Sequence, residues 1–361
     1  MTAELSTICV DPLTEVEALG VIIEMRTSAD TAVGVRERVS AAWKDCRQGQ
    51  VLPTMRRILE LPSAMFDDFE RGLSDLSTRV TLEALDALRG TRLLLHAAGV
   101  ATDDGRVLAM VGPSGRGKTT ASLHLGTHFA YVSDETVAVA DDLAVTAYRK
   151  PLSVITEGHV HKQQVSPSEL GLRPLPEAPL RAVGLTLIDR DPDADEIGPV
   201  AIDTIDAICE MTPQISYLPD LPSPLQHLAR LFDAVGAPTR LTYRDATELP
   251  SLVATMFDSP AVPAPSWEPA PPALSTGPWR AVDVDDAILV DGRACILLDG
   301  VVTALDHRGR LAWMGARRGA TTAEIAQAAV AEFGAPGDGA AVDLIEATLQ
   351  ELCAYGLIEA A

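Results

Sequence analysis

Basic residues are scarce in this 361-residue chain, which carries 29 Lys and Arg against 51 Asp and Glu, a formal net charge of −22. No basic cluster exceeds a pair such as Arg317-Arg318. A surface of this charge repels nucleic acid and anionic membrane, so neither is predicted as a partner. A neutral or basic partner, such as a peptide, is favoured instead.

Cysteines and long apolar runs are also scarce. The five cysteines lie far apart and form no C-x-x-C pair, which favours reduced thiols in a cytoplasmic protein over a disulfide framework. The sequence contains no run of about 18 apolar residues, so it predicts no membrane span. The acidic start, Met1–Glu15, lacks the basic-then-apolar pattern of a signal peptide. We therefore expect a cytoplasmic protein, long enough for two domains.

A phosphate-binding loop is the strongest motif. The apolar run Val107–Val111 predicts a strand, G-x-x-x-x-G-K-[ST] follows, and a helical segment comes next. Glycines let backbone N–H groups turn inward around a phosphate, Lys118 would reach the β- and γ-phosphates, and Thr119 would bind Mg²⁺. The sequence thus predicts binding of ATP or another nucleoside triphosphate with Mg²⁺. The predicted nucleotide-binding residues are Gly112, Ser114, Gly115, Arg116, Gly117, Lys118, Thr119 and Thr120.

Strand-type segments surround this loop. A hairpin is predicted from Leu93–Ala101, the turn Thr102–Gly105 and the strand before the loop. This is unusual, because the strand before a phosphate loop is usually reached from a helix by a parallel crossover. After a helix from Lys118 to about His128, Tyr131–Ala140 reads as one or two strands with Asp134 and Glu135 at their junction. Such a carboxylate can bind Mg²⁺ or accept a proton, and a solvated turn is the alternative of about equal weight.

The N-terminal segment, residues 1–90, shows no site and is predicted to be an α/β scaffold or docking surface. Val16–Met25 reads as a strand and Ala64–Leu88 as a helix. Ala29–Cys46 reads as an amphipathic helix, and its predicted inner stripe consists of Val33, Val35, Val39 and Trp43.

Residues 91–258 are predicted to form the nucleotide-binding domain. Val183–Ile188 reads as a strand and Pro224–Val235 as a helix. Asp189–Glu196 is predicted to be a solvated acidic turn, because it lacks the glycine and glutamate of a calcium-binding loop. The proline-dense stretch Ser259–Pro278 is predicted to be a semi-rigid spacer and the domain boundary.

The C-terminal residues 279–361 read as a small α+β module. Val282–Val290, Ala294–Leu298 and Val301–Leu305 predict three strands, with Asp-Gly pairs at the two turns between them. Thr321–Phe333 predicts a helix with a capping box, and Ala340–Tyr355 predicts a second helix that ends at Gly356. The predicted inward face of that last helix consists of Leu344, Ile345, Leu349 and Leu352.

Residues 91 to about 140 resemble the catalytic domain of HPr kinase/phosphorylase and related phosphoenolpyruvate-carboxykinase-like folds. The resemblance rests on His96 in the strand, the hairpin, the loop Gly112–Thr119 and the acidic Ser133-Asp134-Glu135. It implies Asp134 as base and metal partner with Thr119, and His96 as an orienting group. Glu135 replaces the family's second Asp, and Arg181–Asp189 lacks its later Glu. With these departures, the resemblance still implies nucleotide binding, but it leaves open whether the chain turns the nucleotide over.

Residues 281–361 resemble PqqD-type modules, which grip the leader segments of ribosomally made, post-translationally modified peptides. The hairpin Asp299–Leu305, the stretch TTAEIAQ and the ending ELCAYGLIE carry this resemblance. Such modules bind a leader as an added strand. It implies a groove formed by Val301, Val302, Thr303, Ala304, Leu305 and Asp306 of the strand with Asp343, Ala347 and Gln350 of the last helix. A covered edge is the alternative interpretation.

Together, the sequence predicts an α/β protein, with an HPr kinase/PEP carboxykinase-like P-loop domain and a C-terminal winged-helix module of PqqD type. The first functional hypothesis is a leader-peptide recognition protein that presents precursors to modifying enzymes, similar to the recognition proteins of daptide gene clusters. The alternative is an ATP-dependent kinase acting on a Ser or Thr of the precursor, so enzymatic activity is left undecided. Homo-oligomers are compatible with both.

Overall fold

The computed structural model describes residues 10–28, 31, 33–46, 55–113, 115, 117–155, 162–274, 277–337 and 340–360. The chain forms two compact units. The first comprises residues 1–200, 214–217 and 239–261, and the second comprises residues 201–213, 218–238 and 262–361. Each unit mixes helices with sheets, which confirms the α/β class predicted from the sequence.

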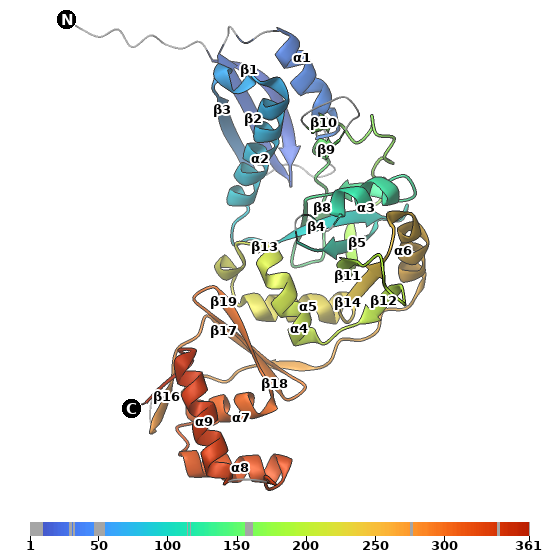
Figure 1. Ribbon diagram of the computed structural model, residues 1–361. Coiled ribbons are helices and arrows are strands. Elements are labelled where there is room, and N and C mark those ends of the chain that lie inside the picture. The colour runs from blue at the N-terminus through green and yellow to red at the C-terminus, as the bar shows by residue number, and fades with distance from the viewer. Residues whose placement is uncertain are drawn as a thin grey trace, which may run out of the picture. The chain divides into compact units, whose positions relative to one another are not determined.

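A three-stranded sheet opens the first unit (Figure 1). Strands β1 (Val10–Ala18) and β2 (Val21–Ser28) form an antiparallel hairpin, and β3 (Met55–Leu61) runs parallel to β2. The predicted single strand over Val16–Met25 is wrong, because Leu19 and Gly20 take φ angles of 55° and 85° and turn the chain there. Helix α2 (Phe69–Ala87) packs against this sheet, close to where a helix was predicted.

The first helix is shorter than the sequence pattern predicts. Helix α1 covers Val33–Ala42, and a 3₁₀ turn follows at Lys44–Cys46. Val39 and Trp43 are fully buried, as predicted, whereas Val33 is 70% exposed. Because the helix begins only at Val33, this residue falls on its exposed first turn instead of the buried stripe.

The central sheet of the first unit carries the phosphate loop. Strand β4 (Leu93–Ala101) pairs antiparallel with β5 (Arg106–Val111), which confirms the predicted hairpin. On its other side β5 runs parallel to β11 (Arg181–Arg190), which in turn runs parallel to β14 (Thr239–Tyr243). Helices α3 (Lys118–Leu125) and α6 (Leu249–Asp258) contact each other beside this sheet. The remaining strands of the sheet are β6 (Ala130–Ser133), β7 (Thr136–Val139), β8 (Val145–Thr146), β12 (Gly198–Ala201) and β13 (Ile215–Ser216).

Two short strands complete the first unit. Strands β9 (Leu152–Val154) and β10 (Gln163–Val165) pair antiparallel with each other in a separate sheet. The acidic block Asp189–Glu196 continues from the end of β11 into a turn that is largely exposed, as predicted.

The second unit is built on an antiparallel sheet with the order β15-β17-β18-β19. Its strands are β15 (Trp267–Pro269), β17 (Asp286–Val290), β18 (Arg293–Leu298) and β19 (Val301–Leu305). Both predicted Asp-Gly turns are present, with positive φ at Asp291, Gly292, Asp299 and Gly300. A second, two-stranded sheet pairs β16 (Trp279–Ala281) with β20 (Ile358–Ala360).

Helices contact this sheet from segments far apart in the sequence. Helix α7 (His307–Arg317), which the sequence analysis did not predict, packs on β18 and contacts α8 (Thr322–Phe333) and α9 (Ala341–Ala354). Helix α4 (Thr204–Met211) packs on β18 and β19, and α5 (Pro224–Val235) packs on β17 and β18. The capping box of α8 is confirmed. On α9, Ile345, Leu349 and Leu352 are buried as predicted, but Leu344 is 40% exposed.

The proline-dense segment is not extended spacer throughout. Strand β15 lies within it and pairs with β17, and Leu274 N–H donates to the carbonyl oxygen of Arg317. The guanidinium of Arg317 in turn donates to the carbonyl of Pro271 at 2.5 and 3.0 Å. Proline is tolerated here because β15 is an outer strand of its sheet in the described part of the chain, where a proline can face the unpaired side.

Candidate functional site

The phosphate loop opens on a cavity of about 360 Å³ in the first unit. Its lining residues are His96, Gly115, Gly117, Lys118, Thr119, Thr120, Asp134, Glu135, Lys150, Ser153 and Lys162. Most of the residues predicted from the motif therefore meet in one place. Ser114 and Arg116, which were also predicted to bind the nucleotide, lie outside the described residues.

Glycines shape the loop between β5 and α3. Gly115 and Gly117 take φ angles of 83° and 87°, a region that other residues rarely adopt. A Cβ at Gly112 would lie 2.8 Å from a methyl carbon of Ile188, so this position has no room for a side chain. Helix α3 starts at Lys118, directly after the loop, so its first N–H groups face the same region as the loop amides.

Lys118 is held against the loop itself. Its Nζ donates to the carbonyl oxygens of Gly112 at 2.5 Å and Pro113 at 3.0 Å. Burial lowers the pKa of Lys118 from 10.5 to about 8, although the charges of Asp134 and Glu135 act in the opposite direction. Neutral carbonyls are weaker partners for an ammonium than phosphate oxygens, so an entering phosphate can displace them.

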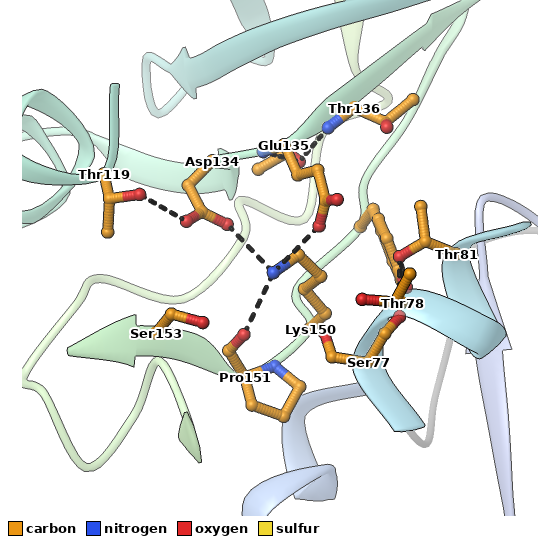
Figure 2. Close-up of polar contacts among 12 residues, drawn as sticks. Ser77, Thr78, Thr81, Thr119, Asp134, Glu135, Thr136, Lys150, Pro151 and Ser153 are labelled. Carbon is orange, nitrogen blue, oxygen red and sulfur yellow. Dashed lines mark hydrogen bonds and ion pairs between the residues drawn. The ribbon is translucent and has the colours of Figure 1, made fainter. Parts of the chain in front are cut away.

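Asp134 lies in the bend between β6 and β7, and both of its carboxylate oxygens accept hydrogen bonds. Thr119 Oγ1 donates to Oδ2 at 3.2 Å and the Tyr131 hydroxyl donates to Oδ1 at 3.0 Å (Figure 2 shows the Thr119 contact). Burial, followed by the charge of Asp134, raises the pKa of Tyr131 well above 10, so the phenol stays protonated as a donor. Asp134 is thereby fixed with one oxygen toward the phosphate loop.

Lys150 is a site residue that the sequence analysis missed. Its Nζ lies 2.9 Å from Glu135 Oε2 and 3.8 Å from Asp134 Oδ1, and it donates to the carbonyl of Pro151 at 3.2 Å (Figure 2). Burial disfavours its charge, but the two carboxylates outweigh burial and raise the pKa of Lys150. The available signal was a pair of basic residues, Arg149 and Lys150, in an apolar stretch of a strongly acidic chain.

His96 lines the same cavity from β4. Its Nδ1 donates to the backbone carbonyl of Glu135 at 3.0 Å, which fixes the ring. Burial, and then the charge of Lys118, lower the pKa of His96, so the imidazole is neutral at pH 7. The ring therefore has a fixed orientation at the cavity wall.

Thr119 and Asp134 form an oxygen pair suited to Mg²⁺. This cation takes few protein ligands and completes its shell with water and substrate phosphates. Among the described residues, no group of three or more His, Cys, Asp and Glu side chains could hold a metal ion.

The predicted peptide-binding residues lie in the second unit. Strand β19 pairs with β18, and within the described residues it is the last strand of its sheet. Val301 is 64% exposed, whereas Leu305 is buried in the core and Asp306 caps α7 by accepting from Gly309 N–H at 2.7 Å. The remaining predicted contacts, Asp343, Ala347 and Gln350, are exposed on α9, which packs against α7, α8 and β20.

Comparison with protein-family models and with curated proteins finds no match to this chain. None of the helices in the described part of the chain has the length and apolar character needed to cross a bilayer.

Proposed function

We propose that this chain recognises the leader segment of a ribosomally made precursor peptide, which adds to β19 as a further strand. The supporting observation is that β19 ends the sheet, with β18 as its one strand partner among the described residues. An outer strand edge offers N–H and C=O groups to an extended peptide, and side chains along it supply specificity. Captured precursor would then be presented to separate modifying enzymes.

We further propose that the first unit binds a nucleoside triphosphate, ATP, together with Mg²⁺. Lys118 would neutralise phosphate charge, the loop amides would surround the phosphates, and Thr119 with Asp134 would hold the metal. The shared cavity of these residues supports this assignment. On this proposal the units have HPr kinase-like and winged-helix folds, and the first serves as scaffold or switch for peptide capture.

Peptide recognition can be tested with proline substitutions in β19. In an antiparallel pair, adjacent residues direct their N–H groups alternately toward the partner strand and away from it. Val302→Pro and Thr303→Pro therefore form a matched pair, in which one variant breaks the ladder with β18 and the other removes an outward N–H. Thermal melting identifies the second variant, because it keeps nearly the wild-type midpoint.

The binding experiment uses the full chain and fluorescently labelled leader segments of short precursor peptides. We expect the stable proline variant to weaken leader binding at least tenfold, as measured by anisotropy. Wild-type affinity in that variant would rule out strand addition at β19. An absence of leader binding by the wild-type chain would remove the recognition function itself.

A second candidate function is phosphoryl transfer to a Ser or Thr of the precursor, favoured by the contact of Asp134 with Thr119 inside the cavity. Asp134 would take the hydroxyl proton while the hydroxyl oxygen bonds to the γ-phosphorus and the bridging β–γ oxygen leaves with ADP. Lys118 would balance the charge and His96 would orient the site. Mass spectrometry of precursor incubated with MgATP tests this. A gain of one phosphoryl group with wild type but not with Lys118→Ala is expected, and an unchanged mass with both excludes it.

A further inference from the structure

Lys150 is a buried cation placed on the carboxylates of the cavity. Its side chain is 6% exposed and that of Asp134 is 5% exposed, so water screens their interaction poorly. The ammonium lies nearer to Glu135 Oε2, at 2.9 Å, than to Asp134 Oδ1, at 3.8 Å. It therefore occupies the position of a counter-ion to both acids.

The two oxygens of Asp134 face different partners. Oδ2 accepts from Thr119, and Oδ1 accepts from Tyr131 and lies toward Lys150. A divalent cation on the Thr119 side would therefore bind a carboxylate whose charge Lys150 already offsets. It would also be repelled by this ammonium through a poorly hydrated interior.

Nucleotide phosphates change that balance. A bound triphosphate adds several negative charges to a cavity whose lining already includes Lys118, Lys150 and Lys162. The added charge attracts a divalent cation and compensates for its proximity to Lys150.

We propose that Lys150 is an internal counter-ion that prevents a divalent cation from binding before the nucleotide, so that metal and nucleotide bind together. This inference rests on the proposed binding of a Mg²⁺-nucleotide to the phosphate loop. Lys150 is thus a positioning residue for the acid pair and sets the order in which the ligands bind.

The test measures Mn²⁺ binding to the full-length chain from the electron paramagnetic resonance signal of free Mn²⁺. Without nucleotide we expect weak binding to wild type and at least tenfold tighter binding to Lys150→Met, which keeps the length of the side chain and removes its charge. Lys150→Arg keeps the charge and should behave as wild type. Adding Asp134→Asn to Lys150→Met should abolish the gain, because the gained ion would be held by that carboxylate.

Two results overturn the inference. One is a folded Lys150→Met variant that binds Mn²⁺ no more tightly than wild type. The other needs no variant and is a nucleotide-free wild-type chain that binds Mn²⁺ as tightly as the same chain saturated with ADP. Lys150→Gln replaces Lys150→Met if circular dichroism shows the latter unfolded.

A parallel titration with a fluorescent ATP analogue separates this inference from the proposed function. If the wild-type chain binds the analogue but Mn²⁺ affinity is independent of Lys150, only the counter-ion role fails. If the chain binds no analogue, the proposed nucleotide site fails and the inference fails with it.

Discussion

Lys118 is a titratable residue whose charge should control nucleotide affinity. Burial lowers its pKa to about 8, so it loses its proton above pH 8. A bound phosphate favours the ammonium and raises this pKa, so binding above pH 8 must take up a proton. We predict nearly constant affinity for a fluorescent ATP analogue from about pH 7 to 7.5 and a loss of up to about tenfold per pH unit above 8.

Lys118→Arg is the matched control for this pH dependence. Its guanidinium stays charged over the whole range, so its affinity should not show the same fall. A wild-type affinity that stays constant up to pH 10, measured by fluorescence titration, would contradict the lowered pKa.

Motif spacing predicted several site residues, because a phosphate loop is a local structure. Lys118, Thr119 and the flanking strand and helix are fixed by residues close to one another in sequence. Asp134 was predicted from its place at a strand junction. The contact between Lys150 and Glu135 could not be predicted, since it depends on how the chain returns past β8 to the cavity. The hydrogen bond from the buried Tyr131 hydroxyl to Asp134 could not be predicted either, because Tyr131 has the sequence context of an ordinary strand residue.

At the scale of elements, the two Asp-Gly turns of the second unit differ in their surroundings. Gly292 and Gly300 have φ angles of 75° and 77°, so both disfavour a Cβ to the same extent. A Cβ at Gly292 would also lie 2.8 Å from the His307 ring, whereas at Gly300 the nearest atom is 3.7 Å away. We predict that Gly300→Ala costs about 1 kcal/mol and that Gly292→Ala costs about 1 kcal/mol more.

Urea unfolding of both variants checks this prediction. The two substitutions share chemistry and backbone conformation, so the difference in their free energies of unfolding reports the contact with His307. Equal losses would show that the ring moves aside at no cost, and a larger loss at Gly300 would contradict the structure of that turn.

Elements were predictable where local chemistry determines them. The hairpin turns have Asp-Gly pairs, and α8 has its capping box. Helix α7 was missed because it contains Gly309 and Gly315, which lower its intrinsic helix propensity. Packing supplies the compensation, since a Cβ at Gly315 would lie 2.5 Å from Ile325 of α8. The helix therefore depends on a contact that sequence patterns do not contain.

At the scale of the whole molecule, the second unit is assembled from separate parts of the chain. Asp286 in β17 accepts hydrogen bonds from the N–H groups of Leu225 and Gln226 at 2.8 and 3.0 Å, and so caps α5. Arg293 in β18 pairs with Asp203 and Asp206 at the start of α4. Local patterns gave no sign that residues 201–213 and 218–238 belong with the C-terminal strands, because these contacts join residues 60 to 90 positions apart.

One face of the second unit's sheet should therefore depend on α4 and α5. Ile288 and Val290 follow Asp286 at every second position of β17, so their side chains lie on the same face, the one that meets α5. Leu297 of β18 lies directly opposite Asp286 and shares that face. All three side chains are at most 2% exposed. Exposing them would cost roughly 5 kcal/mol or more at about 1.5–3 kcal/mol each, which is comparable with the whole stability of a small domain.

We therefore predict that a fragment of residues 262–361 does not fold cooperatively on its own. A fusion of residues 201–238 to 262–361 through a flexible linker restores α4 and α5 and should melt cooperatively as a monomer, as followed by circular dichroism and size-exclusion chromatography. The fragment alone should melt without a sharp transition or self-associate through its uncovered apolar face. If instead it melts within a few degrees of the fusion, α4 and α5 add little to the sheet, and the C-terminal strands and helices form a self-sufficient module.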